Sequence, residues 1–205
     1  MRRSEDFSAT CRAAVLAYEP NSSAWTHLVQ TRLRELASVF ADAYGRNDRG
    51  GALHQSRIVH ALPWIFAVED EQGSFVAASY VFRGGRRAAS GVVAKHQGHG
   101  HYSQMVKHSL EFVPAQFTEL RPHQHRQRHS LNAAGFTAQN DWEQVASLLG
   151  PLLVPLVHDV SHVDGELHYE RLSFDGGEKR EFVLLQRGLP APIVQSTPYY
   201  PRSVP

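Results

Sequence analysis

The chain has 205 residues, 42% of them hydrophobic, and a formal net charge of +1 with histidine neutral. This length and composition allow a real core, and we favour one domain followed by an extended tail. A net charge this close to zero gives no general argument for a nucleic-acid or membrane partner. Cys11 is the only cysteine, which excludes an internal disulfide and a multi-cysteine zinc site. With no apolar run of about 18 residues and no secretion signal, we expect a cytoplasmic protein without a membrane span.

The N-terminal part of the chain predicts a strand followed by a long helix. An apolar run over 10–18 indicates the strand, and Ser22 or Ser23 can cap the helix that follows. From Trp25 onward, apolar residues recur at three- and four-residue steps as far as the neighbourhood of Gly45. This periodicity places them on one face of a helix.

The next segment predicts a short helix and three antiparallel strands. Residues 47–51 are polar and glycine-rich, which indicates a loop, and 52–62 favours a helix that stops before a proline. The runs 64–68 and 74–82 are rich in aromatic and β-branched residues and predict a hairpin. A further apolar run at 88–94 predicts the third strand.

The second half predicts alternating helices and strands. After the glycine turn, apolar residues at helical spacing predict a helix that ends at Pro114. Residues 117–120 favour a strand parallel to the preceding one. Residues 123–134 favour a strongly cationic helix closed by Gly135. An added helix is expected over 142–157, kinked or divided at its Gly-Pro pair.

The chain should close with a hairpin and a tail. Strands are expected at 166–174 and 180–186, because Asp175-Gly176 between them is a strong hairpin signal. Residues 190–205 contain five prolines and predict a solvated tail or an arm lying on a partner, which is compatible with a homodimer. We therefore expect one domain over 1–189 and a proline-rich tail over 190–205.

The most informative stretch is the turn between the 88–94 strand and the following helix. It reads Gln97-Gly98-His99-Gly100-His101-Tyr102. Glycine lets the backbone approach a ligand and adopt positive φ, and the first N–H groups of a helix point toward an anion. A strand, a glycine turn and a helix start in this order predict a site for a phosphorylated cofactor.

The spacing of this turn resembles a known family. Gln97-x-x-Gly100-x-Tyr102 is similar, except at its last position, to the Gln/Arg-x-x-Gly-x-Gly/Ala pattern of the GCN5-related N-acetyltransferases. Ala134-Gly135-Phe136 also resembles the end of that superfamily's second cofactor-side helix. The resemblance implies an α/β fold of the α+β type, a mixed and mostly antiparallel sheet flanked by helices. The expected helix at about 140–160 is then an insertion before the last hairpin.

The resemblance also implies a cofactor, namely acetyl-CoA or another acyl-CoA. Backbone groups of the strand at Val92 and Val93 would bind the pantetheine arm, and residues Gln97, Gly98, His99, Gly100, His101 and Tyr102 would bind the pyrophosphate. Tyr102 stands where the family has a small residue, so its side chain either crowds the phosphate or points away. The implied reaction is transfer of an acetyl or short acyl group to an amine of a small molecule or protein.

Acyl transfer to an amine needs a group that removes a proton and one that helps the thiolate leave. Many family members carry a tyrosine four residues before the glycine that ends the second cofactor-side helix, and Leu131 stands there. The substitutes are Glu119, His123 and Ser130. Histidine can act near neutral pH, although His123 can equally cap or solvate the helix, and Glu119 fits an ordinary surface carboxylate.

Thirteen histidines raise a metal hypothesis. The candidate pairs are His99-x-His101, His123-x-His125 and His158-x3-His162, the last of which could share one face of a helix. None has a cysteine or carboxylate at a recognised spacing, and the first lies in the cofactor turn, so no metal site is predicted.

Two further readings remain open. The basic cluster over 121–129 suggests nucleic-acid modification on the same fold, as in the phage Mom-type proteins, although most such runs are solvated helix faces. Leu131 and Tyr102 instead support a degenerate, non-catalytic domain of this fold that binds a partner. We favour the acyltransferase.

Overall fold

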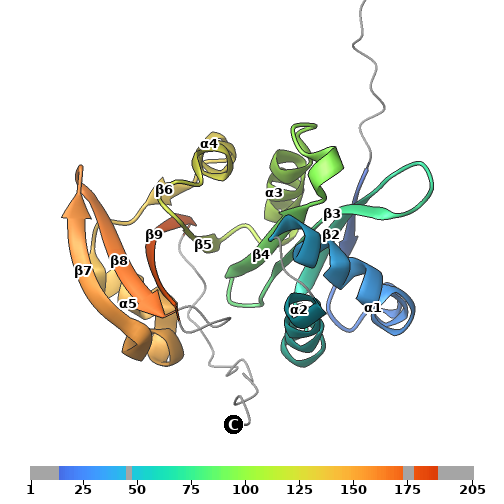
Figure 1. Cartoon of the computed structure of the whole chain (residues 1–205), viewed down its shortest axis with the longest axis horizontal. Helices are drawn as coiled ribbons and strands as arrows, with labels where there is room; N and C mark the ends of the chain where they lie inside the picture. The colour runs from blue at the N-terminus through green and yellow to red at the C-terminus, as the bar shows by residue number, and fades with distance from the viewer. Residues whose placement is uncertain (1–13, 45–47, 173–177, 189–205) are drawn as a thin grey trace, which may run out of the picture.

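The computed structural model describes residues 14–44, 48–172 and 178–188, which form two β-sheets side by side with helices packed against both (Figure 1). Cys11, the Asp175-Gly176 turn and the 190–205 tail lie outside the described residues. Among the helices of the described part, none has the length and apolar character needed to cross a bilayer. The architecture matches the mixed, mostly antiparallel fold that the sequence predicts.

The first sheet is antiparallel and buried. Its order is β1 (Val15–Tyr18), β2 (Trp64–Glu69), β3 (Phe75–Val81) and β4 (Arg87–Val92). The predicted antiparallel arrangement of the last three strands is confirmed. Every residue of β3 is buried because helices cover both faces of the sheet (Figure 1).

Two helices pack together on one face of this sheet, α1 (Ser23–Ala43) and α2 (Asp48–Ala61). The predicted cap is confirmed, since the Ser22 hydroxyl accepts a hydrogen bond from the Trp25 N–H at 3.1 Å. The loop predicted over 47–51 is wrong, because α2 already begins at Asp48. Packing along α1 outweighs the poor helix propensity of the glycines at this end of α2.

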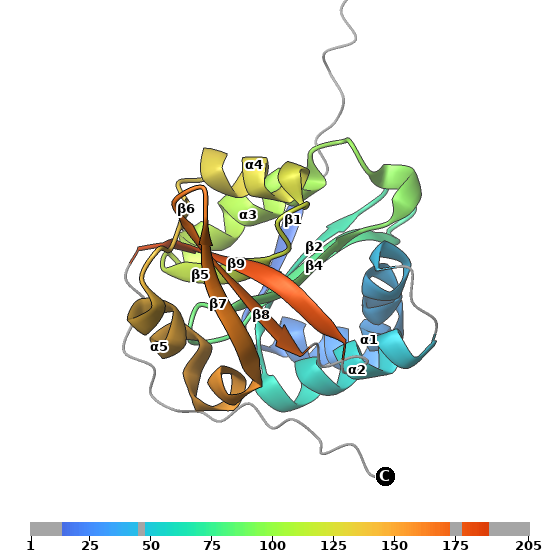
Figure 2. The ribbon, with the colours of Figure 1, turned by 60° about the vertical axis from the view of Figure 1, so that its left-hand side comes forward.

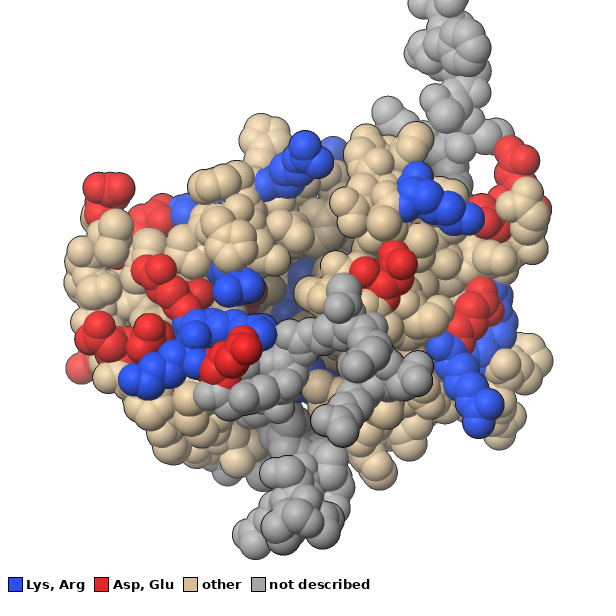
Figure 3. Space-filling view, viewed as in Figure 1, with Lys and Arg blue, Asp and Glu red and all other residues tan. Residues whose placement is uncertain are grey.

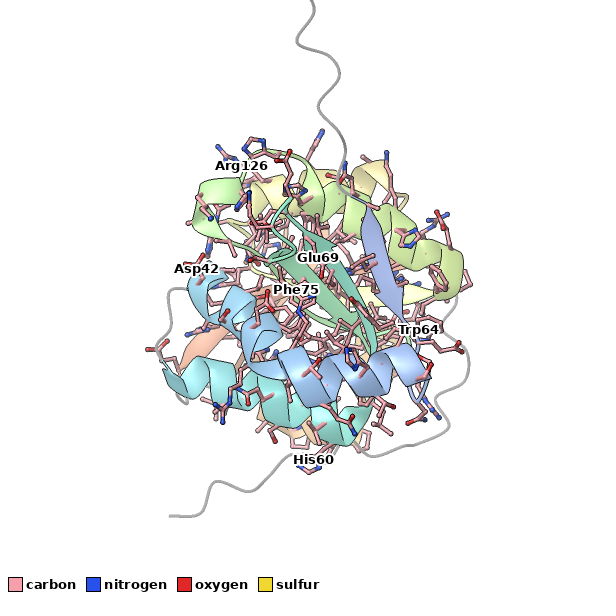
Figure 4. All side chains as sticks on the ribbon, turned by 90° about the vertical axis from the view of Figure 1, so that its right-hand side faces the viewer. Asp42, His60, Trp64, Glu69, Phe75 and Arg126 are labelled. Atoms are coloured by element: carbon pink, nitrogen blue, oxygen red, sulfur yellow. The ribbon has the colours of Figure 1, made fainter. Side chains whose placement is uncertain are left out.

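A polar network fastens α1 to the β2–β3 hairpin, where Glu69 and Phe75 lie beside the helix (Figure 4). The Arg32 guanidinium lies 3.8 Å from the centre of the Phe75 ring and pairs with Glu35 at 2.8 Å and with Glu69. Glu35 also accepts the backbone N–H of Phe75 at 2.9 Å. This cluster fixes the hairpin against α1.

The second sheet has the order β5 (Gln116–Leu120), β9 (Lys179–Arg187), β8 (Glu166–Leu172) and β7 (Val157–Val163), with β6 (Thr137–Ala138) also pairing with β9. Figure 2 shows β7, β8 and β9 in front of the first sheet. The predicted final hairpin is present as β8 and β9, whereas sequence reasoning missed β6 and β7.

The added helix is shorter than predicted. α5 (Trp142–Leu153) is interrupted at Gly150, whose φ of 72° is not helical, and the 3-10 turn η2 (Val154–Leu156) then leads into β7. His158 and His162 therefore lie on a strand, so the shared helical face expected for them is wrong. Four residues along a strand separate their backbones by roughly 13 Å.

The remaining two helices connect the sheets. α3 (His101–Phe112) covers the other face of the first sheet, and α4 (His125–Ala133) packs on α3. Gly135 follows α4 with a φ of 86°, as expected for a residue that closes a helix. Leu131 of α4 is fully buried with Val106 and Leu120.

Within the described residues, the backbones of the two sheets pair at one place, beside the start of β4. Arg86 and Phe117 form a parallel bridge, and the Phe117 N–H donates to Gly85 O at 3.0 Å. A Cβ on Gly85 would lie 2.3 Å from Ala115 O, so this approach requires glycine. Beyond this point the strands pair no further, and the expected parallel pair is confirmed at its start.

Candidate functional site

A cleft of about 550 Å³ opens where β4 and β5 diverge. Its walls come from the end of α1, from α2, from β4 and β5, from the start of α4 and from β8 and β9. Figure 3 shows the hollow between the two halves, with Lys or Arg atoms at its depth. Tyr102 of α3 lines it as well, so residues far apart in the sequence meet at one cavity.

A β-bulge shapes the β4 wall of the cleft. Tyr80 pairs with Ala89 but Val81 pairs with Arg87, so Ala88 is an extra residue. A bulge bends its strand and increases the local twist, which helps β4 to part from β5. It also turns Arg87 toward Ser79 and toward Ser109 of α3, with which it makes hydrogen bonds.

The outer edge of β4 has backbone groups without a neighbouring strand. At Ser90, the Tyr44 hydroxyl donates to the carbonyl at 3.0 Å and accepts from the N–H at 3.3 Å. Val92 O accepts from the Gln97 side chain at 3.4 Å. The predicted Val93 group is already used inside the sheet, since its N–H donates to Val76 O at 2.9 Å. The outer edge therefore comprises Ser90 and Val92, whose backbone groups are bonded to side chains, those of Tyr44 and Gln97, and not to another strand. Ser90 was not identified in the sequence analysis.

At the C-terminal end of β4, the glycine turn presents backbone donors. Gly98 and Gly100 have φ values of 87° and 79°, and no described atom lies within 4 Å of a Cβ built on either. Within the described structure, no hydrogen bond uses a backbone N–H of residues 98–103 as donor. Unpaired N–H groups at the start of a helix can bind an anion, and a larger residue at either glycine would enter the open space beside them.

Comparison with known proteins decides the fold. No protein-family model and no curated protein matches the sequence. A ribosomal-protein alanine N-acetyltransferase from Escherichia coli matches the structure with a TM-score of 0.53 and 10% identity, over 91% of this chain and 100% of that chain. An acetyltransferase from Bacillus subtilis in complex with CoA gives 0.50 and 11% identity, over 87% and 99%. The chain has the GCN5-related N-acetyltransferase fold.

In this fold the Gln97–Tyr102 turn occupies the predicted place between β4 and α3, and Tyr102 is the residue that departs from the pattern. Its side chain lines the cleft rather than the turn and packs beside the cluster that contains Leu131. Burial raises the pKa of Tyr102 to about 12, although the charge of Arg87 opposes the shift. The phenol therefore stays protonated at neutral pH and leaves the glycine turn open.

Three histidines, His96, His99 and His101, lie in the turn or directly before it. The His101 ring centre lies 6.4 Å from that of His96 and 6.1 Å from that of His99. Burial lowers the pKa of His101, and the neighbouring histidines lower it further. In the described part of the chain, no group of three His, Cys, Asp or Glu residues is arranged to hold a metal ion.

Glu119 is buried, with 7% of its side chain exposed, so the expectation of a surface carboxylate is wrong. Arg171 donates to both its oxygens at 2.6 and 2.8 Å, Arg86 pairs with it at 2.6 Å and the Tyr169 hydroxyl donates at 2.9 Å. Burial alone would raise the pKa of Glu119, but the two arginines and Tyr169 outweigh it and lower the pKa to about 2. Such a carboxylate is too weak a base to remove a proton from an amine.

The other two predicted catalytic residues lie apart. His123 is exposed in the loop before α4 and lines the cleft, as Glu119 does. Ser130 accepts from the Ser103 hydroxyl at 2.8 Å and so ties α4 to the first turn of α3, away from the cleft residues. The structure therefore brings Glu119 and His123 to one cavity and leaves Ser130 beside the glycine turn.

Arg87 is the main residue that sequence reasoning missed. It is 4% exposed, and its terminal nitrogens donate to Ser79, Ser109 and, at 2.9 Å, to Gln116. Burial lowers its pKa. No sequence signal pointed to Arg87, because it follows a turn-like Arg-Gly-Gly-Arg segment and its partners lie on other elements.

Proposed function

We propose that the protein is an acyl-CoA-dependent N-acyltransferase. The observation that carries the proposal is the juxtaposition of the unpaired N–H groups of residues 98–103 with the open edge of β4, beside a cleft. The turn fits a diphosphate, since a Cβ on Gly98 or Gly100 would enter the space that an anion needs. The GCN5-related fold and the CoA complex of the Bacillus subtilis protein support this choice of cofactor.

When bound, acyl-CoA supplies an acyl group activated as a thioester. The 98–103 N–H groups would hold its diphosphate. Ser90 and Val92 would offer backbone groups to the pantetheine amides in place of their bonds to the Tyr44 and Gln97 side chains. These contacts would orient the cofactor along the outer edge of β4.

Within the cleft, we assign proton transfer to two residues. Tyr102 holds a proton at its hydroxyl oxygen, which a departing thiolate requires, and it takes over the role of the tyrosine that Leu131 replaces. His123 at the rim accepts a proton from the amine. Glu119 has a positioning role instead, because it holds Arg86 and Arg171 in place.

Calorimetric titration with acetyl-CoA tests the cofactor site. Gly100→Val places a branched side chain where the diphosphate is held, and we expect at least a tenfold loss of affinity. Gly73→Val is the matched control, because Gly73 also has a positive φ, of 76°, and open space around it but lies in the β2–β3 turn. Both variants should lose a similar 1–2 kcal/mol of stability, by roughly the cost of this backbone conformation. A folded wild type that does not bind acetyl-CoA would sink the proposal.

A second candidate is a non-catalytic domain of this fold, favoured by the buried Leu131 in place of a phenol. The two are separated by an amine screen with the bound cofactor, read as release of free thiol. Binding of acetyl-CoA without transfer to any amine would favour the binding domain, and transfer would exclude it.

A further inference from the structure

Arg87 at the start of β4 is a cation buried among neutral groups. Only 4% of the residue is exposed. Its terminal nitrogens donate to the hydroxyls of Ser79 and Ser109 and, at 2.9 Å, to the side-chain oxygen of Gln116. Within the described part of the chain, its charge has no carboxylate partner, and the Tyr102 phenol is the titratable group that acts on it. The positive charge of Arg87 is therefore not balanced by an acid there.

A buried charge of this kind is costly. Taking a guanidinium group out of water carries a desolvation penalty that neutral hydrogen-bond acceptors offset only in part. The Nε atom of Arg87 is also buried, without a hydrogen-bond partner among the described residues. A neutral side chain could join β4 to α3 and β5 through the same serine and glutamine groups. Stability of the fold therefore does not account for a charge at this position.

The charge of Arg87 lies beside the part of β4 that we assign to the cofactor. Arg87 and Ser90 both line the cleft. The Arg87 Nη1 atom lies 3.5 Å from the Ser90 hydroxyl oxygen, and the backbone groups of Ser90 belong to the outer edge of β4. The bulge at Ala88 brings the guanidinium group to this position.

Arg87 also acts on the proposed acid. Tyr102 lines the same cleft, and Tyr102 and Ser109 lie about two turns apart on one face of α3. Since Arg87 bonds to Ser109, its guanidinium group lies against the face of α3 that carries Tyr102. Burial raises the pKa of Tyr102, whereas the charge of Arg87 lowers it and Tyr44 raises it again. A fixed cation here favours any group in the cleft that becomes negatively charged.

We propose that Arg87 is a positioning residue of the acyl transfer, whose fixed positive charge stabilises the negative charge that forms in the cleft as the thiol leaves. This inference rests on the proposed function. In that reaction the amine nitrogen bonds to the acyl carbon and gives a proton to His123, while the carbon–sulfur bond breaks with its electron pair on sulfur. Tyr102 gives its hydroxyl proton to the sulfur, so the negative charge moves to the phenol oxygen. Water returns a proton to Tyr102 as His123 releases its own. Arg87 favours the charge on either atom.

A thiol in place of the Tyr102 phenol measures this effect without catalysis. Cys11→Ser combined with Tyr102→Cys leaves one cysteine in the chain, and its pKa is read from thiolate absorbance as the pH rises. We expect added Arg87→Gln to raise that thiol pKa by about one unit or more, which is about a tenfold loss of thiolate at a given pH. Added Arg34→Gln, which removes an exposed charge of α1 outside the cleft, should leave the thiol pKa unchanged.

Two further variants separate the charge of Arg87 from its packing. Arg87→Lys keeps a cation, so its thiol pKa should stay closer to that of the parent than the pKa in Arg87→Gln does. Arg87→Met removes the cation while keeping a long side chain, so it should match Arg87→Gln. An unchanged thiol pKa in both neutral variants would overturn the proposal. Failure of both neutral variants to fold would also overturn it, because Arg87 would then serve the fold itself.

Acyl transfer then separates this inference from the proposed function. With acetyl-CoA and an accepted amine, we expect Arg87→Gln to lower kcat about 30-fold or more while the acetyl-CoA dissociation constant changes less than about threefold. Arg87→Lys should restore part of the lost kcat. Wild-type transfer with an unchanged kcat in Arg87→Gln would overturn the role of Arg87 and leave the acyltransferase intact. A raised thiol pKa in Arg87→Gln without wild-type transfer to any amine would instead overturn the acyltransferase, while the effect of Arg87 on charge in the cleft would stand.

Discussion

The two ends of β4 are built in opposite ways. At the C-terminal end, the donors are backbone N–H groups of one continuous run, residues 98–103, in a turn shaped by Gly98 and Gly100. At the N-terminal end, the donors are arginine side chains from several elements around Glu119 and Arg87. A backbone site depends on conformation and tolerates side-chain changes, whereas the arginine cluster depends on the pairing of buried charges.

Glu119→Gln is expected to have the largest effect, a loss of stability that acts at the N-terminal end of β4 and not at the glycine turn. It leaves Arg86 and Arg171 buried without their carboxylate, so we expect a loss of about 3–5 kcal/mol in urea denaturation at pH 7. Glu178→Gln, which removes an exposed pair, should cost less than about 0.5 kcal/mol. Folded Glu119→Gln protein should still bind acetyl-CoA, because the glycine turn does not contact Glu119 or its arginine partners.

The stability difference between the wild type and Glu119→Gln should depend on pH with a definite sign. The folded-state pKa of Glu119, about 2, lies below its ordinary value of 4.5. The ionised Glu119 carboxylate therefore stabilises the folded protein fully above pH 4.5, and this stabilisation is lost as the pH falls toward 2. The difference between the wild type and Glu119→Gln should shrink over that interval. An unchanged difference at pH 2.5 would contradict the ion-pair account.

A smaller, purely catalytic effect is expected from Tyr102→Phe. If Tyr102 belongs to the cleft and not to the turn, kcat should fall about 100-fold while the acetyl-CoA dissociation constant changes less than threefold. Tyr18→Phe on β1, at the far edge of the first sheet, is the control. Weaker acetyl-CoA binding with unchanged kcat would place Tyr102 in the phosphate site instead.

The smallest effect concerns the turn itself. Burial lowers the pKa of His101, and a bound diphosphate favours its protonated form, so cofactor binding should take up protons. Acetyl-CoA affinity should then rise as the pH falls from 7.5 to 5.5, by about threefold more in the wild type than in His101→Gln. His27→Gln, on the exposed face of α1, should follow the wild type. Parallel pH profiles for all three would exclude His101 from the site.

Local signals accounted for much of the fold. The Ser22 cap, the apolar face of α1, the β2–β3 hairpin and the break at Gly150 each depend on neighbours in the chain, and each is present in the structure. The start of α2 and the strand β7 were missed for a shared reason. Their residues show no strong period, and packing on α1 or pairing with β8 decides their conformation.

The sequence by itself determined the glycine turn, because its six donors are consecutive backbone groups whose geometry follows from two glycines and a helix start. Only the tertiary structure decided that Tyr102 points into the cleft, that Glu119 is a buried counterion and that Arg87 is a buried cation. Burial and charge pairing arise between segments such as Arg87 and Gln116, or Glu119 and Arg171, that are distant in the chain. No local pattern encodes those contacts, which exist only once the two sheets have met at Gly85.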